Sequence, residues 1–325
     1  MKYEEIERTV AFYEKEIIHM PNELFDELRS NINNSQQLAF AYSYLYLTTY
    51  LYRHCKYYNV GGLDNDKIKE ILGYSSNTRS INPLIKKGGL LDQLQMTSTV
   101  KDFPLSWTYD SLTKNLEFMM FSELDGEDDE ETIQNVKKSL GRKYSIKLPV
   151  RAFYRYPHIE ECKEAYEDGD EDGTFFEVEN THQIPFEVFM FCMANDKIGT
   201  IGFYIYSYIK MMNNFYKGGY DCPVEKLAKE TGIATRTLTN YLDELKKYNM
   251  IQCLVNQKHF VLGLPDEERK ANTYIVNEFD SFSDIPQAYE KIKIKTRAEY
   301  YAEQREKYKH LWGKECDIPL EDLPY

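Results

Sequence analysis

The pattern of apolar and polar residues between positions 223 and 251 predicts two helices joined by a tight turn. The apolar residues of the second helix are spaced as on one helical face: Leu238, Tyr241, Leu242 and Leu245. In the first helix, Leu227 and Ala228 are predicted to face the core. Gly232 is expected to end that helix, because the turn needs a residue that tolerates a positive φ. Thr235 is predicted to cap the second helix with its hydroxyl oxygen.

The residues off this apolar stripe are the candidate ligand contacts. The N-terminal end of the second helix of a helix-turn-helix meets base edges in the major groove of DNA. An arginine at that place suits guanine, and an asparagine suits adenine. We therefore predict that the outer face of the second helix binds DNA through Thr235, Arg236, Thr237, Thr239, Asn240 and Lys247.

Two strands are predicted directly after the second helix. The segment 250–263 is typical of a strand and a bend, and 271–279 of a return strand, with the polar loop LPDEERK between them. Arg269 and Lys270 in this loop are predicted to contact phosphates. Because two strands joined by a loop after such a helix form a wing, the segment 198–279 resembles a winged helix-turn-helix domain. The resemblance implies DNA binding; a winged helix that contacts only proteins is the alternative.

Similar residues recur about 160 positions apart. MPNELF at 20–25 resembles IPFEVF at 184–189, and Tyr-Ser-Tyr occurs at 42–44 and again at 206–208, both with an offset of 164. Further along, Gly73 matches Gly232, and the pair Leu90-Leu91 matches Met250-Ile251. This ordered series of matches predicts a duplicated unit.

The first copy departs from the pattern of the second. Pro83 falls inside its second helix, so this helix is predicted to be kinked there, or to be short and to restart. Gly88-Gly89 loosens its end, and the segments LLDQLQMTST, FPLSWTYD and NLEFMMF are typical of wing strands. The first copy is expected to contact DNA more weakly, through Asn77, Arg79, Ser80, Lys86 and Lys87.

Together these patterns predict a mostly α-helical fold with small β wings, built as two tandem winged helix-turn-helix domains. The expected organisation is an N-terminal winged-helix domain at 1–122, a connecting region at 123–180 and a C-terminal winged-helix domain at 181–284. A helix and a tail follow at 285–325. The helix, predicted over 285–313, is expected to lie on DNA, to pack on the second domain or to pair with another subunit.

The net charge of −13 comes from two short runs. Residues 123–131 and 160–172 each contribute −7, so the rest of the chain sums to +1 and nucleic-acid binding is not excluded. The segment 132–157 between the runs is basic and aromatic. Two interpretations remain open for its bases: Arg142, Lys143, Lys147, Arg151 and Arg155 either follow a phosphate backbone or neutralise the acidic runs.

Motifs of enzymes and metal sites are missing from the sequence. The six cysteines form no C-x-x-C pair, so no metal and no cofactor is expected. The sequence contains no P-loop and no G-x-S-x-G motif, which favours a binding protein over an enzyme. The N-terminus has no signal-peptide pattern, and the most apolar run is too short to span a membrane. The expected location is the cytoplasm, away from membranes.

The architecture resembles replication initiators of plasmids and phages and regulators of mobile elements, although no diagnostic family motif is present. The resemblance implies a sequence-specific protein that binds double-stranded DNA, either a transcriptional regulator or a replication initiator of a bacterial mobile element. The acidic runs or the tail would then contact replication or transcription proteins. The alternative is a module that binds proteins or mimics DNA. The oligomeric state is left open.

Overall fold

The structure is a computed structural model of the 325-residue chain. The described residues are 1–12, 15–57, 63–110, 115–124, 134, 144–156, 171–257, 259–262, 264–265, 270–289 and 293–312. Within them the fold is α+β: helices supply most of the core, and the strands form small sheets of two or three strands. None of the described helices is long and apolar enough to cross a membrane.

The first half of the chain runs from an N-terminal helix to a short helix near residue 150. Its helices are α1 (Tyr3–Val10), α2 (Leu24–Asn31), α3 (Ser35–Arg53), α4 (Asn65–Ile71), α5 (Asn82–Ile85), α6 (Leu90–Gln93), the 3-10 turn η1 (Phe121–Glu123) and α8 (Val150–Phe153). Its strands are β1 (Ile17–Pro21), β2 (Ser98–Val100), β3 (Pro104–Asp110), β4 (Asn115–Met120) and β5 (Ile146–Leu148). Strand β5 lies in the predicted connecting region, yet it pairs with β2 of the first half.

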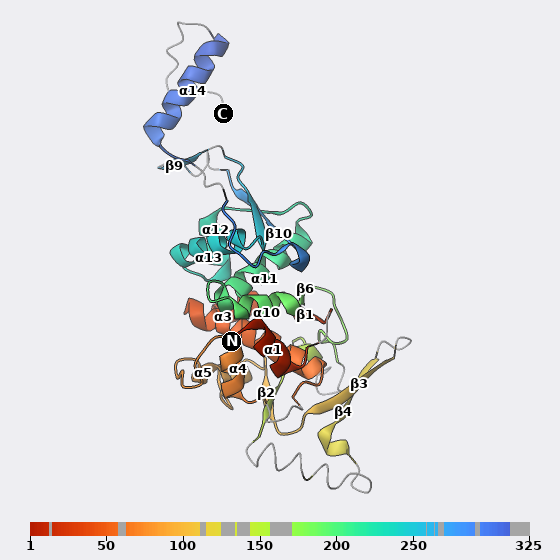
Figure 1. Ribbon diagram of the computed structural model, residues 1–325. Coiled ribbons are helices and arrows are strands. Elements are labelled where there is room, and N and C mark those ends of the chain that lie inside the picture. The colour runs from red at the N-terminus through yellow and green to blue at the C-terminus, as the bar shows by residue number, and fades with distance from the viewer. Residues whose placement is uncertain are drawn as a thin grey trace.

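The second half begins at a strand and ends in a projecting helix (Figure 1). Its helices are α10 (Phe186–Ala194), α11 (Gly199–Phe215), α12 (Val224–Thr231), α13 (Thr235–Lys247), the 3-10 turn η4 (Phe279–Ser281) and α14 (Arg297–Trp312). Its strands are β6 (Thr181–Pro185), β7 (Tyr220–Cys222), β8 (Ile251–Leu254), β9 (Phe260–Leu262), β10 (Asn272–Val276) and β11 (Ile294–Thr296).

The last helix is shorter than the sequence pattern indicates, because β11 pairs in parallel with β9 just before it. Thr296 and Glu299 then form a capping box: the Thr296 N–H donates to the Glu299 carboxylate at 2.8 Å, and the Glu299 N–H donates to the Thr296 hydroxyl at 3.3 Å. The helix therefore begins at Arg297 rather than near 285.

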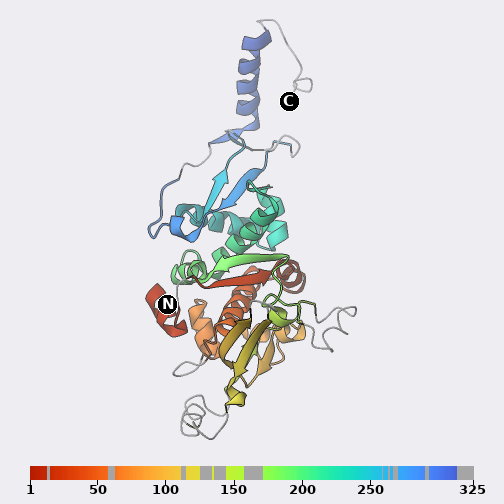
Figure 2. The ribbon, with the colours of Figure 1, turned by 90° about the vertical axis from the view of Figure 1, so that its right-hand side faces the viewer.

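The two halves meet in an antiparallel pair of strands, β1 and β6, which lie side by side at the middle of the molecule (Figure 2). His19 pairs with Gln183, and Met20 pairs with His182. His19 and Gln183 are 164 positions apart, which is the offset of the repeat. A residue that pairs with its own counterpart marks a local two-fold axis, so the two copies are related here by a pseudo-two-fold rotation.

Helices α3 and α11 pack against each other beside this axis. Both are buried on almost every side, as expected of helices at the centre of a large core. Their aromatic rings interlock across the two halves: Phe203 meets Tyr42 at 5.9 Å and Tyr46 at 5.0 Å between ring centroids. The counterparts Ser43 and Ser207 each donate to the carbonyl oxygen four residues earlier. One hydrophobic core thus runs through both halves.

The residues that follow α6 in the first half and α13 in the second half correspond to each other in a way that differs from the prediction. Gln95 and Asn249 both have a left-handed φ, and the next N–H, of Met96 or Met250, donates to a leucine carbonyl five residues earlier. Met96 is therefore the counterpart of Met250, and the predicted match of Leu90-Leu91 with Met250-Ile251 is wrong. The physical reason is that Leu90–Gln93 is helical, as α6, and is not part of a strand.

Corresponding strands follow in both copies. Strand β2 pairs with β5 as β8 pairs with β10, and the Met96 carbonyl accepts from Val150 as the Met250 carbonyl accepts from Asn277. In the chain, the hairpin β3–β4 is therefore inserted between β2 and β5, the strands that correspond to β8 and β10. It projects at the end of the molecule opposite α14 (Figure 1). β3 and β4 agree with the strands predicted from FPLSWTYD and NLEFMMF.

Candidate nucleic-acid interface

The predicted pair of helices is present as α12 and α13. Gly232 has a φ of +69° at the C-terminal end of α12, and Ile233 is buried in the turn. Leu238, Leu242 and Leu245 are buried, which confirms the apolar stripe. The turn packs closely on α3, because an added Cβ at Gly232 would lie 2.9 Å from the Leu38 side chain, and the positive φ itself favours glycine.

The predicted capping role of Thr235 is wrong. The N-cap position is Ala234, and no side chain of α13 caps the helix. Ser35 of the first half holds the turn instead: its hydroxyl donates to the Gly232 carbonyl at 3.2 Å and accepts from the Ala234 N–H at 3.4 Å. Thr235 is the first residue of α13 rather than its cap.

The outer face of α13 presents most of the predicted contacts to solvent. Thr235, Arg236, Thr239 and Asn240 are exposed, whereas Thr237 is partly buried. Within the part of the chain that the structure describes, no hydrogen bond or ion pair holds the side chains of Arg236 and Asn240. These two side chains are one helical turn apart and project from the same face.

The other predicted contacts of the second half differ in their surroundings. Lys247 is partly exposed, and its ammonium forms an ion pair with Glu244 at 2.6 Å. Lys270 is exposed just before β10. Arg269 lies outside the described residues. Leu254 and Val255, at the end of β8, are 49% and 40% exposed, so the predicted wing presents apolar side chains to solvent as well as Lys270.

The counterpart of α13 in the first half is broken, in agreement with one of the two predicted alternatives. It consists of α5 and α6, with Pro83 in the first turn of α5 and Gly88 at a φ of +67° between them. The predicted contacts of the first half are all exposed: Asn77, Arg79, Ser80, Lys86 and Lys87. The first three belong to the loop before α5, and the two lysines follow α5.

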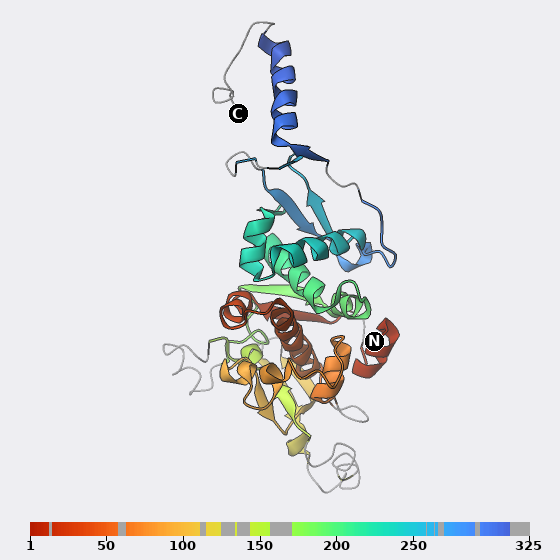
Figure 3. The same cartoon turned by 90° about the vertical axis from the view of Figure 1, so that its left-hand side faces the viewer.

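Both candidate regions lie on one side of the molecule. Helices α4 and α5 of the first half and α12 and α13 of the second are found on the left in Figure 1, and they face the viewer in Figure 3. A ligand that spans this side would contact both halves.

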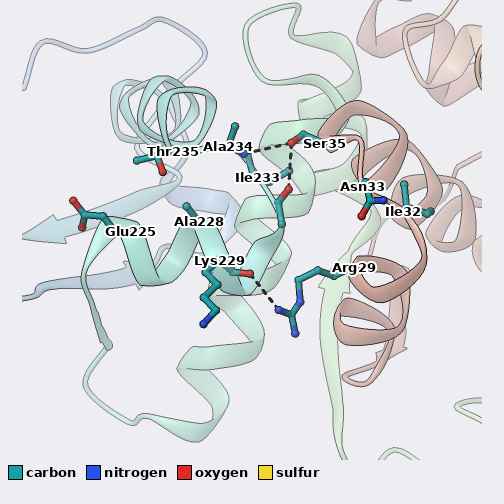
Figure 4. A pocket seen from close by; sticks show the side chains of 11 residues that line it. Arg29, Ile32, Asn33, Ser35, Glu225, Ala228, Lys229, Ile233, Ala234 and Thr235 are labelled. Carbon is teal, nitrogen blue, oxygen red and sulfur yellow. Dashed lines mark hydrogen bonds between the residues drawn. The ribbon is translucent and has the colours of Figure 1, made fainter.

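A pocket lies at the α12–α13 turn, where the second half meets α2 and α3 (Figure 4). The Arg29 guanidinium reaches across it and donates to the Lys229 carbonyl at 3.3 Å. The residues that line the pocket come from both halves: Arg29, Ile32, Asn33, Ser35, Glu225, Ala228, Lys229, Gly232, Ile233, Ala234 and Thr235. Arg29 and Ser35 carry no local sequence signal for this role, because both act across the boundary between the copies.

Three of the basic residues between the acidic runs form buried ion pairs within the first half. Lys147 forms an ion pair with Asp92 at 2.6 Å, Arg151 with Glu27 at 2.7 Å and Arg155 with Glu23 at 2.6 Å. All three side chains are buried, and the carboxylates of these ion pairs lie outside the acidic runs. The second run also contributes one contact, because the Arg155 N–H donates to the Asp172 carboxylate at 2.7 Å. The three basic side chains hold 144–156 against the rest of the first half and cannot follow a phosphate backbone. Arg142 and Lys143 lie outside the described residues.

Two further features of the described residues concern metal binding and thiol reactivity. The described residues contain no group of three His, Cys, Asp or Glu side chains that could hold a metal ion. The described cysteines are unpaired thiols, and burial raises the pKa of Cys192 well above its ordinary value and that of Cys222 to about 11. Such thiols are protonated and poorly nucleophilic at neutral pH.

Comparison of the chain with protein-family models, with curated proteins and with solved structures found no match.

Proposed function

We propose that the chain binds double-stranded DNA with the side that carries α12, α13 and the loop before α5. In this proposal α13 enters the major groove, and Arg236 and Asn240 contact base edges. The strand pair β8–β10 lies beside the groove as a wing, with Lys270 near a phosphate.

One observation carries the proposal: the order of the elements in the second half. The chain runs α11, β7, α12, α13, β8, β9, β10; β7, β10 and β8 form one sheet in that spatial order, and β9 pairs with β11 outside it. Three helices with a three-stranded sheet in this order are what a winged helix-turn-helix would have, and this agreement supports the proposal. The exposed and unpaired Arg236 and Asn240 on α13 add the chemistry that base recognition requires.

The first half supports a two-part site. Several of its helices and strands correspond to those of the second half, and its helices α4 and α5 lie on the same side of the molecule as α12 and α13 (Figure 3). One chain would then present two DNA-contacting units without a second subunit. Linking the two contacts in one chain raises the overall affinity by effective concentration alone.

The test is selection of duplexes from a random-sequence library by the full-length chain, followed by footprinting. We expect a preferred sequence with protected major-groove positions. Arg236→Ala should weaken binding to it by about 1–3 kcal/mol and relax the preference at one position. The matched control is Arg8→Ala, because Arg8 is an exposed arginine on α1.

Failure to select any duplex, together with unchanged behaviour of Arg236→Ala, would contradict the proposal and favour a module that binds proteins or mimics DNA. Genomic fragments bound by the chain would distinguish the two biological roles. Bound promoters would indicate a transcriptional regulator, and an origin with repeated sites would indicate a replication initiator of a mobile element.

A further inference from the structure

The loop before α5 is longer than its counterpart in the second half. From Gly73 to Gln95 the chain advances 22 residues, whereas from Gly232 to Asn249 it advances 17; all four residues have a positive φ and occupy equivalent places. The five extra residues fall in the loop at 75–81, where the second half has only a short turn. The first half therefore projects a loop at the place where α13 begins in the second half.

This loop is held at both of its ends. The Lys69 ammonium donates to the Ser76 carbonyl at 3.0 Å, and the Gln37 amide donates to the Ser80 carbonyl at 2.9 Å. Lys69 is itself buried and forms an ion pair with Asp66 at 2.8 Å. The loop conformation is thus set before any ligand arrives, which lowers the entropic cost of binding.

Exposed polar side chains lie between these two attachment points. Asn77 and Arg79 are exposed, and no hydrogen bond or ion pair within the described part of the chain holds the Arg79 guanidinium. The next residues cannot replace the loop as a reading element, because α5 has only four residues and Lys86 after it is extended. A single helical turn is too short to lie along a major groove.

The dimensions of DNA favour the minor groove for such a loop. The minor groove is about 6 Å wide, whereas the major groove of about 12 Å admits a helix. Arginine and asparagine are side-chain types that read the minor groove, and arginine is attracted by the strong negative potential of narrow A·T tracts. The loop at 75–81 carries both of these side-chain types, in Arg79 and Asn77.

We propose that the first half reads the minor groove of an A·T-rich segment through Arg79 and Asn77, beside the major-groove segment contacted by α13. This inference rests on the proposed binding of duplex DNA. It makes the two halves unlike readers: the second recognises base edges through a helix, and the first recognises groove width and A·T content through a loop.

The experiment uses the full-length chain and the duplex that it selects. Individual A·T pairs are replaced by inosine·cytosine pairs, which leave the minor groove like that of A·T but give the major groove the pattern of G·C. We expect affinity within about twofold of the original in the A·T-rich segment, because the minor-groove edge is preserved. At the positions read by α13, the same exchange should weaken binding about tenfold.

Variants supply the second arm. Arg79→Ala should weaken binding about tenfold and abolish the preference for A·T over G·C in that segment, while the preference at the α13 positions remains. Lys87→Ala is the matched control, since Lys87 is an exposed basic residue of the same half that lies outside the loop. It should weaken binding to all sequences alike.

Two results would overturn the inference alone: equal losses from inosine·cytosine exchange in both segments, or an A·T preference that survives Arg79→Ala. A chain that selects no duplex at all would overturn the proposed DNA binding, and this inference with it.

Discussion

His182 makes the stability of the protein dependent on pH. Its ring is fully buried at the strand pair β1–β6, within 2.6 Å of the Tyr42 hydroxyl at Nε2 and 2.9 Å of the Asn22 side-chain oxygen at Nδ1. Because that oxygen only accepts, Nδ1 carries the proton and Nε2 accepts from Tyr42. Burial, with a smaller contribution from His19, lowers the pKa of His182 to about 3.

The unfolded chain binds a proton at this histidine below about pH 6.5, whereas the folded chain does so only below about pH 3. The free energy of unfolding should therefore fall as the pH drops through this window, by about 1.4 kcal/mol per pH unit from this residue. Denaturant titrations at pH 5.5, 5 and 4.5, inside this window, would measure the slope. In His182→Gln the slope should be smaller by that amount; equal slopes would argue against a neutral buried ring.

Arg155 is expected to contribute to stability and not to DNA affinity. Its guanidinium pairs with Glu23 and also donates to the Asn180 carbonyl at 2.6 Å. Arg155→Met should lower the free energy of unfolding by about 3 kcal/mol, because it leaves Glu23 half-buried without its cation. The double variant Glu23→Leu/Arg155→Met should lose less, since no uncompensated charge remains. A stable Arg155→Met protein with a reduced salt dependence of DNA binding would show that the arginine faces phosphate instead.

At the scale of elements, the two equivalent turns differ in what surrounds their glycines. Gly73 and Gly232 both have a positive φ, but an added Cβ meets nothing within 4 Å at Gly73. At Gly232 it meets Leu38 at 2.9 Å and Arg29 at 3.2 Å. Gly73→Ala should therefore cost about 1 kcal/mol of conformational strain, and Gly232→Ala should cost more.

Gly218→Ala is the control, because its φ is not positive and its Cβ would have open space. Melting temperatures should fall in the order Gly218→Ala, Gly73→Ala, Gly232→Ala, with the first close to the unchanged protein. Equal melting temperatures for the last two would mean that α3 does not pack tightly on the α12–α13 turn.

The same elements show how far the sequence could predict the fold. Local signals were sufficient for α12, α13 and the strands after them, because a complete apolar stripe and a turn glycine leave few alternatives. Pro83 indicated an interrupted helix, but the interruption lies at 86–89, where Gly88 has a positive φ, and Pro83 itself lies in the first turn of α5, where proline is tolerated. The role of Ser35 in holding the α12–α13 turn, and the ion pairs of Lys147, Arg151 and Arg155, depend on contacts far apart in the chain, and no local pattern encodes them.

The pseudo-two-fold axis is a property of the whole molecule, and the predicted helices and strands did not reveal it. The repeat could be recognised from the matches at an offset of 164, but a repeat can be arranged in tandem or around an axis. Only the pairing of His19 with Gln183 distinguishes the two arrangements. The sequence predicted Asn77, Arg79 and Ser80 as DNA contacts, but the extra length of the loop that carries them becomes clear only when Gln95 is matched with Asn249.

The shared core predicts that the two halves fold as one unit. Strand β6 has its only described strand partner in β1, and α11 buries its aromatic side chains against α3. A fragment of residues 181–325 would expose this strand edge together with Phe203 and Tyr204, which are fully buried in the intact chain. Exposed apolar area of this kind destabilises the folded state by roughly 25 cal/mol per Å² and promotes aggregation.

We therefore expect fragments 1–180 and 181–325 to be unfolded or aggregated when produced separately, and to form a soluble one-to-one complex when produced together. Circular dichroism and sedimentation would measure both states. Tyr46→Ala supplies a second measurement in the intact chain: Tyr46 contacts Phe203 and donates to the Ile184 carbonyl at 2.9 Å, so its loss should lower hydrogen-exchange protection in α11 as well as in α3. A 181–325 fragment that melts cooperatively on its own, with α11 protected as in the intact chain, would instead show that the halves are independent domains brought together only by the chain between them.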